Sequence, residues 1–182
     1  MAAAGLDAFI QAFESFTSRY ATPWTRALAE CALVRISQNL LPFYRGDRAA
    51  APEMLEASYI TGMAFSHSRL GVIHGLAHPL GARFHAPHGL TCACCLKACL
   101  AFNKALIADD LLRIKNVYQL DIEEQVSTWL TAMSLTNPFQ GGTIHDLDAF
   151  IAETLTSGST AANPRSVTAE DVVQLVQQIT CM

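Results

Sequence analysis

The stretch GVIHGLAHPLGARFHAPHG, residues 71–89, carries four histidines in nineteen positions and is punctuated by glycines. His74 and His78 are four residues apart, so on a helix they project from one face about a turn from each other. His88 stands in a Pro-His-Gly corner that can fold it back toward the other two. Imidazoles bind iron, zinc, nickel and copper, and several of them with a carboxylate form a metal site. The spacing leaves two interpretations open: a metal site, or histidines that serve in packing and at the surface.

Outside this stretch, apolar residues recur at helical spacing along nearly the whole chain. In residues 4–18, Leu6, Phe9, Ile10 and Phe13 share one helical face. No alternating pattern of useful length predicts a strand, and no internal repeat is found. We expect an all-α fold, a helical bundle that forms a single domain over residues 1–182. Further helices are expected over 22–46, 47–69, 88–104, 107–118, 121–135, 146–156 and after 168, with the histidine stretch in short pieces and loops at 136–146 and 157–166.

Capping residues support two of these helices. Thr22 is a suitable N-cap and is followed by Pro23, a residue favoured at the first helical position. Thr168 precedes Asp171 by three residues, which resembles a capping box at the start of the last helix. These signals predict where both helices begin.

The composition narrows the function classes. The chain has 182 residues, is 51% hydrophobic and is 15% charged, which is typical of a well-buried domain. Its 12 basic residues against 16 acidic ones provide no basic stripe, so we expect no nucleic-acid partner. The N-terminus lacks the basic region of a signal peptide, and no stretch approaches about 18 uncharged apolar residues, so we expect no membrane span. Six cysteines, four of them within residues 92–99, fit a reducing, cytoplasmic compartment.

Residues 71–89 resemble the signature of the iron-containing alcohol dehydrogenase family, roughly G-x-x-H-x-x-A-H-x-x-G-x-x-x-x-x-P-H-G. Every fixed position of that pattern is present. GLDAFIQAFES, residues 5–15, and NPRSVTAEDV, residues 163–172, resemble the first helix and the C-terminal stretch of the all-α domain in this family, which belongs to the dehydroquinate synthase-like superfamily. The resemblance implies an oxidoreductase in which a divalent metal ion, Fe²⁺ or Zn²⁺, polarises an alcohol or carbonyl oxygen during hydride transfer with NAD(P).

The resemblance also assigns roles to individual residues. It implies that Asp7, His74 and His88 are metal ligands, and that His78 is a catalytic neighbour in the substrate pocket or proton path. Gln11 stands where the family has another histidine ligand, and a glutamine offers only a neutral amide oxygen. Two histidines and one carboxylate suffice for zinc or ferrous iron with open positions. We therefore expect a metal site that is weakened at the position of Gln11.

The resemblance places a dinucleotide-binding domain before the helical one, with a glycine-rich phosphate loop. No G-x-G-x-x-G follows a strand in this sequence, so we expect that N-terminal domain to be absent and the chain to be inactive without it. The expected partners are a small alcohol or aldehyde, a separate nucleotide-binding domain or subunit, and a second copy in a homo-oligomer. Two alternatives stay open: a non-catalytic helical remnant or interaction module, and a maleylacetate reductase-like or other oxidoreductase of the same superfamily.

Other residues with metal-binding chemistry have a simpler interpretation. Cys92, Cys95 and Cys99 lie on one helical face and could form a thiol site. The segment resembles the small, apolar helix that follows the signature, however, and free cysteines pack as small hydrophobes. His67 and His85 flank the signature and are expected in solvated or core positions. We therefore expect none of these five residues to bind the metal.

Overall fold

The computed structural model describes residues 2–181, and every regular element within them is a helix. The all-α prediction is confirmed. The helices are α1 (Ala2–Thr17), α2 (Pro23–Tyr44), α3 (Ala50–Ser68), α4 (Val72–Phe84), α5 (His88–Tyr118), α6 (Ile122–Ala132), α7 (Leu147–Thr156), α8 (Gly158–Ala161) and α9 (Ala169–Cys181).

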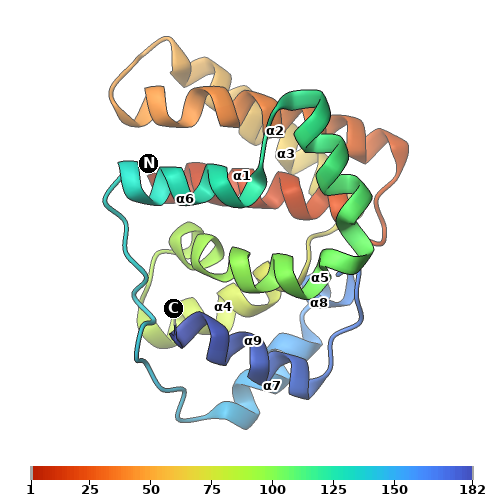
Figure 1. The fold of residues 1–182 in the computed structure, drawn as a ribbon, viewed down its shortest axis with the longest axis vertical. Helices are drawn as coiled ribbons and strands as arrows, with labels where there is room; N and C mark the ends of the chain where they lie inside the picture. Colours follow the sequence, from red (N-terminus) through yellow and green to blue (C-terminus); the bar gives the residue numbers. More distant parts are fainter. Residues whose placement is uncertain (1, 182) are drawn as a thin grey trace.

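The helices form two groups with the first part of α5 between them (Figure 1). One group contains α1, α2, α3 and α6, and the other contains α4, α7, α8 and α9. Helix α1 packs against α2 and α3 on one side and against α5 on the other. Helix α5 also contacts α4, α6 and α9, while α4 contacts α7 and α8. The apolar stripe of α1 that the sequence predicted is fully buried, with Leu6, Phe9 and Ile10 at 0% exposure. Because α1, α4 and α5 meet at the centre, their side chains converge there.

The predicted caps are present in the structure. The Thr22 side chain accepts a hydrogen bond from the Thr25 N–H, with Pro23 at the start of α2. The Asp171 N–H donates to Thr168 Oγ1 over 3.2 Å, and the Thr168 N–H donates to Asp171 Oδ2 over 2.9 Å. Both helices begin where local side-chain chemistry satisfies their first N–H groups.

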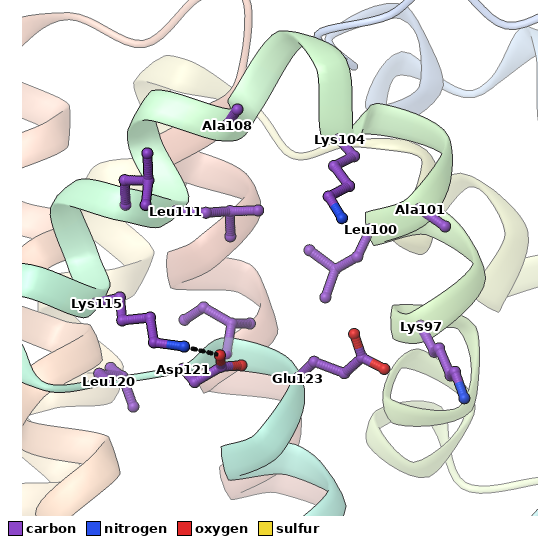
Figure 2. A pocket seen from close by; sticks show the side chains of 12 residues that line it. Lys97, Leu100, Ala101, Lys104, Ala108, Leu111, Lys115, Leu120, Asp121 and Glu123 are labelled. Atoms are coloured by element: carbon purple, nitrogen blue, oxygen red, sulfur yellow. Dashed lines mark hydrogen bonds and ion pairs between the residues drawn. The ribbon is translucent and has the colours of Figure 1, made fainter.

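Three predictions about element boundaries were wrong. The loop expected over 157–166 contains a short helix, α8, whose first turn is capped by the Ser157 side chain. Most of the stretch expected in short pieces is one helix, α4 (Val72–Phe84), because Gly75 serves close packing: a Cβ there would collide with the side chain of Thr160 in α8. The helices expected over 88–104 and 107–118 are one helix, α5. Residues 105 and 106 are Ala and Leu, which are good helix formers, so nothing in the chain ends the helix there. The ribbon bends instead, between the positions of Lys104 and Ala108 (Figure 2).

Among residues 2–181, one helix, α5, has the length and composition that could cross a membrane, with a mean hydropathy of 1.5 in its most apolar window. That window is 61% buried inside the domain. Its buried residues include the four cysteines of 92–99, which pack in the main apolar core. Helix α5 therefore has the apolar composition and burial of a central core helix.

Candidate metal centre

Helix α1 brings two carboxylates to the centre of the domain. Asp7 and Glu14 are two turns apart and thus lie on the same side of the helix. Glu14 is buried, whereas Asp7 is partly exposed. Gly89 allows α5 to approach at this point, because a Cβ there would collide with the carbonyl oxygen of Ala3 and lie 3.0 Å from Asp7 Cβ. The close approach of the two helices places Asp7 beside the start of α5.

The N-terminus of α4 is held by buried side chains rather than by its own cap. The Ile73 N–H donates to Glu14 Oε1 over 2.7 Å, and the Val72 N–H donates to Asn163 Oδ1 over 3.1 Å. Asn163 belongs to the NPRS segment, and exchanges amide hydrogen bonds with Asn103 of α5. First-turn N–H groups that would otherwise lack partners are satisfied in this way. The position of His74, in the first turn of α4, is fixed by the same contacts.

Four side chains converge where α1, α4 and α5 meet. His74 Nε2 lies 3.2 Å from Asp7 Oδ1, and His88 Nε2 lies 3.5 Å from the same oxygen. Cys92 Sγ lies 3.7 Å from each of these two ring nitrogens and 3.9 Å from Asp7 Oδ1. All four donor atoms lie within 4.8 Å of one another, a spacing that one metal ion can bridge.

Glu14 orients the His74 ring. Its Oε2 lies 2.6 Å from His74 Nδ1, so Nδ1 carries the proton that this carboxylate accepts. In the metal-bound form this arrangement would leave the Nε2 lone pair directed at the cluster. Burial lowers the pKa of His74, but the Cys92 thiol, the hydrogen bond to Asp7 and the Glu14 contact outweigh it, and the pKa lies well above its usual value. These acidic neighbours thus favour the protonated ring of His74 over the neutral one.

Burial is the largest influence on the pKa values of the donors His88 and Cys92. Burial lowers the pKa of His88, and the neighbouring His74 and His78 add to this against the attraction of Asp7. Burial raises the pKa of the fully buried Cys92 thiol, although the nearby His74 opposes the shift. His88 is therefore biased toward the neutral ring, the form that coordinates a metal.

His78 lies beside the cluster rather than in it. It is exposed, its Nδ1 is 2.6 Å from the backbone carbonyl oxygen of His74, and its ring stacks on that of His88 with centroids 4.7 Å apart. Gln11 follows Asp7 by one turn on α1 and is partly exposed. The structure thus brings Asp7, His74 and His88 together, as the sequence resemblance implied, with His78 at their open side.

The roles of Glu14, beside the cluster, and of Cys92, within it, were not anticipated from the sequence. Glu14 is a lone acid in an apolar stripe two turns after Asp7, a spacing that could have indicated a shared site. Cys92 follows His88 by one turn of α5, but the sequence grouped it with Cys95 and Cys99. Those two cysteines are buried in the core, and neither belongs to the donor group.

A separate hollow of about 570 Å³ lies between α5 and the start of α6 (Figure 2). Its lining combines leucines of α5 with the lysines Lys97, Lys104 and Lys115, the last paired with Asp121 at 3.0 Å. None of the four metal-type donors is among the residues that line it. The chemistry-bearing cluster and this hollow are distinct features of α5.

The fold and the cluster define a helical domain with metal-binding donors at the junction of three helices. The chain belongs to the Fe-containing alcohol dehydrogenase family, because the family's C-terminal domain model matches residues 1–180. Lactaldehyde reductase from Escherichia coli strain K12 is 33% identical over 188 aligned residues, which cover 96% of this chain and 49% of that protein. The resemblance seen in the sequence is confirmed.

Solved structures show the same domain. An alcohol dehydrogenase from Oenococcus oeni is 32% identical, with a TM-score of 0.75 over 98% of this chain and 51% of that one. The iron-containing alcohol dehydrogenase from Thermococcus thioreducens is 22% identical and shares the fold, with a TM-score of 0.84 over 96% of this chain and 49% of that one. The chain therefore spans about half the length of the relatives it matches.

Proposed function

We propose that this chain is the metal- and substrate-binding half of an NAD(P)-dependent oxidoreductase that interconverts a small alcohol and its aldehyde. The observation that carries the proposal is the meeting of Asp7, His74 and His88. Asp7 Oδ1 lies 3.2 Å from His74 Nε2 and 3.5 Å from His88 Nε2. Membership of the alcohol dehydrogenase family and the oxidoreductase relatives support the same reaction class.

The donor set fits a divalent ion, because a carboxylate oxygen and two imidazole nitrogens from separate helices converge on one point. Bound there, Fe²⁺ or Zn²⁺ supplies a Lewis acid for the alcohol or carbonyl oxygen. Asp7, His74 and His88 hold the ion, and Glu14 keeps His74 in the tautomer that coordinates through Nε2. His78, exposed and with Nδ1 engaged, presents its Nε2 for positioning the substrate or moving its proton.

The nicotinamide cofactor binds to protein outside these 182 residues, in the same polypeptide or in a partner subunit. The sequence has no glycine-rich phosphate loop after a strand, and the relatives are about twice as long. Titration of the 182-residue chain with NADH and NADPH, followed by nucleotide fluorescence, is expected to show no saturable binding and no alcohol oxidation. Saturable binding with turnover would contradict this division of roles.

A reducing, cytoplasmic location agrees with the cysteines. The six cysteines are free, and Cys92, Cys94, Cys95 and Cys99 are buried in the core. Burial, with a smaller effect from Cys92, raises the pKa of Cys94 to about 12, so this thiol resists ionisation. Free thiols packed in this way do not depend on an oxidising compartment.

The decisive experiment is metal analysis of protein purified without chelators. The wild type is expected to hold about one divalent ion per chain, and His74→Ala and His88→Ala are expected to lose it. His145→Ala is the matched control, because His145 is exposed in the 136–146 loop and lies outside the cluster. Metal-free wild type after reconstitution attempts with Fe²⁺ and Zn²⁺, or unchanged metal content in both variants, would overturn the proposal.

A further inference from the structure

Cys92 contributes a fourth donor to the metal centre. Its side chain is fully buried, and its sulfur makes three contacts, to His74 Nε2, His88 Nε2 and Asp7 Oδ1. The thiol therefore faces the three other donors directly. These donors come from α1 and α4 as well as from its own helix, so the arrangement is a property of the assembled domain.

Five of the separations between the donors are close to those of a tetrahedral metal site. Bonds of about 2.3 Å to sulfur and about 2.0–2.1 Å to nitrogen and oxygen, at tetrahedral angles, set S···N separations of about 3.5 Å and N···O separations of about 3.3 Å. The structure has two S···N separations of 3.7 Å and N···O separations of 3.2 and 3.5 Å. The S···O separation is 3.9 Å, and all four donor atoms lie within 4.8 Å of one another. These five separations differ from the tetrahedral values by no more than about 0.4 Å.

The Cys92 thiol supplies the fourth donor that Gln11 is poorly suited to provide. Where the family resemblance places a fourth ligand on α1, this chain has a weak amide donor, and the sulfur of Cys92 enters the site from α5. A thiolate is a stronger and softer ligand than an amide oxygen for a late divalent metal. The chain thus has four strong donors despite the glutamine.

We propose that Cys92 is a metal ligand, and that Asp7, His74, His88 and Cys92 form an N₂OS site selective for Zn²⁺ or Co²⁺ over Fe²⁺. On binding, the Sγ–H bond breaks, the proton passes to solvent, and a sulfur–metal bond forms in its place. Zinc sites can expand their coordination, so an ion held by these four residues would still be able to polarise a substrate oxygen. This inference rests on the proposed function only in requiring that the centre binds a metal.

The test uses cobalt as a spectroscopic probe. Chelator-treated protein is titrated with CoCl₂, and absorption spectra are recorded. The wild type and Cys99→Ala are expected to develop a near-ultraviolet thiolate-to-Co²⁺ charge-transfer band that saturates at one equivalent. Cys92→Ala should lose that band. Its Zn²⁺ affinity, from competition with a chelating dye, should fall by at least the roughly 10–100-fold that loss of an outer-shell partner costs. Cys99→Ala is the matched control, because Cys99 is equally buried on the same helix but outside the donor group.

A second measurement needs no variant. X-ray absorption of the Zn²⁺-loaded wild type is expected to show one sulfur neighbour at about 2.3 Å. Metal bound with only nitrogen and oxygen neighbours, or a charge-transfer band that survives in folded Cys92→Ala, would overturn the role of Cys92 and leave the proposed function standing. Failure of the wild type to bind Co²⁺ or Zn²⁺ at all would overturn both.

Discussion

Replacing Gly89 by alanine should separate two helices that build the metal centre. An added Cβ would collide with the Ala3 carbonyl oxygen and lie 2.6 Å from the Ala3 carbonyl carbon and 3.0 Å from Asp7 Cβ. Carbon atoms in ordinary contact are about 3.5–4.0 Å apart, so the backbones of α1 and α5 must move apart by about 1 Å. Because the obstructing atoms at Ala3 belong to the main chain, no change of rotamer can relieve the contact.

The cost follows from overpacking a closely packed interface. Insertion of one methyl group between fixed helices destabilises a protein by about 1–3 kcal/mol. For a chain of this size, each kcal/mol lowers Tm by about 2–4 °C, so a loss of about 2 kcal/mol corresponds to about 4–8 °C. The same displacement moves Asp7 away from His88, and metal binding should weaken with it.

Urea unfolding followed by circular dichroism measures this effect, and Gly62→Ala is its control. Gly62 lies inside α3 with no atom within 4 Å of an added Cβ, so alanine there should stabilise the protein by about 0.5–1 kcal/mol. The two substitutions are chemically identical and are expected to change the free energy of unfolding in opposite directions. A Gly89→Ala protein as stable as the wild type, with unchanged zinc affinity, would refute the packing argument.

Two further predictions concern charged contacts. Glu14→Gln removes the negative charge that polarises the His74 ring, so zinc affinity, measured by dye competition, should fall by about 10–100-fold with helix content retained; an unchanged affinity would contradict this. Hydrogen bonds from Arg83 lower the pKa values of Asp146 and Glu153 in the folded protein. These contacts therefore stabilise the fold at any pH above the pKa values that the two carboxyls have in the unfolded chain. The stabilisation is lost as the pH falls through their lower pKa values in the folded protein. Arg83→Met should thus be less stable than the wild type near neutral pH in low salt, and the difference in urea midpoint should shrink below about pH 4; a pH-independent difference would count against the ion pairs.

Local chemistry explains which parts of the fold the sequence could predict. The start of α2 depends on Thr22 and its neighbours, and the start of α9 on Thr168 and Asp171, all within three residues. Such signals act before any tertiary contact forms. The continuity of α4 does not have a local origin, because Gly75 serves the packing of α8, and the sequence alone cannot distinguish a glycine that ends a helix from one that admits a neighbour.

The same distinction applies to the metal centre. The family resemblance singled out Asp7 on the first helix and His74 and His88 in the signature, and the structure places their donor atoms together. Helical spacing grouped Cys92 with two other cysteines, because periodicity reports which residues share a face of one helix. It does not report what that face meets. The meeting of α1 with α5, which brings Cys92 to Asp7, depends on a backbone approach that no single-helix pattern contains.

The electrostatics of this junction explain why carboxylates accompany the imidazoles. His74 lies in the first turn of α4 and His88 begins α5, so two helix N-termini, each with a partial positive charge, lie beside the centre. Two neutral imidazoles alone would leave a divalent cation opposed by both helix ends. Asp7 offsets this charge as a direct donor, and Glu14 does so from behind, where it accepts the Ile73 N–H as well as the ring proton. A single buried carboxylate thus secures the start of α4 and counters the helix dipole from the side of His74 opposite the donor group.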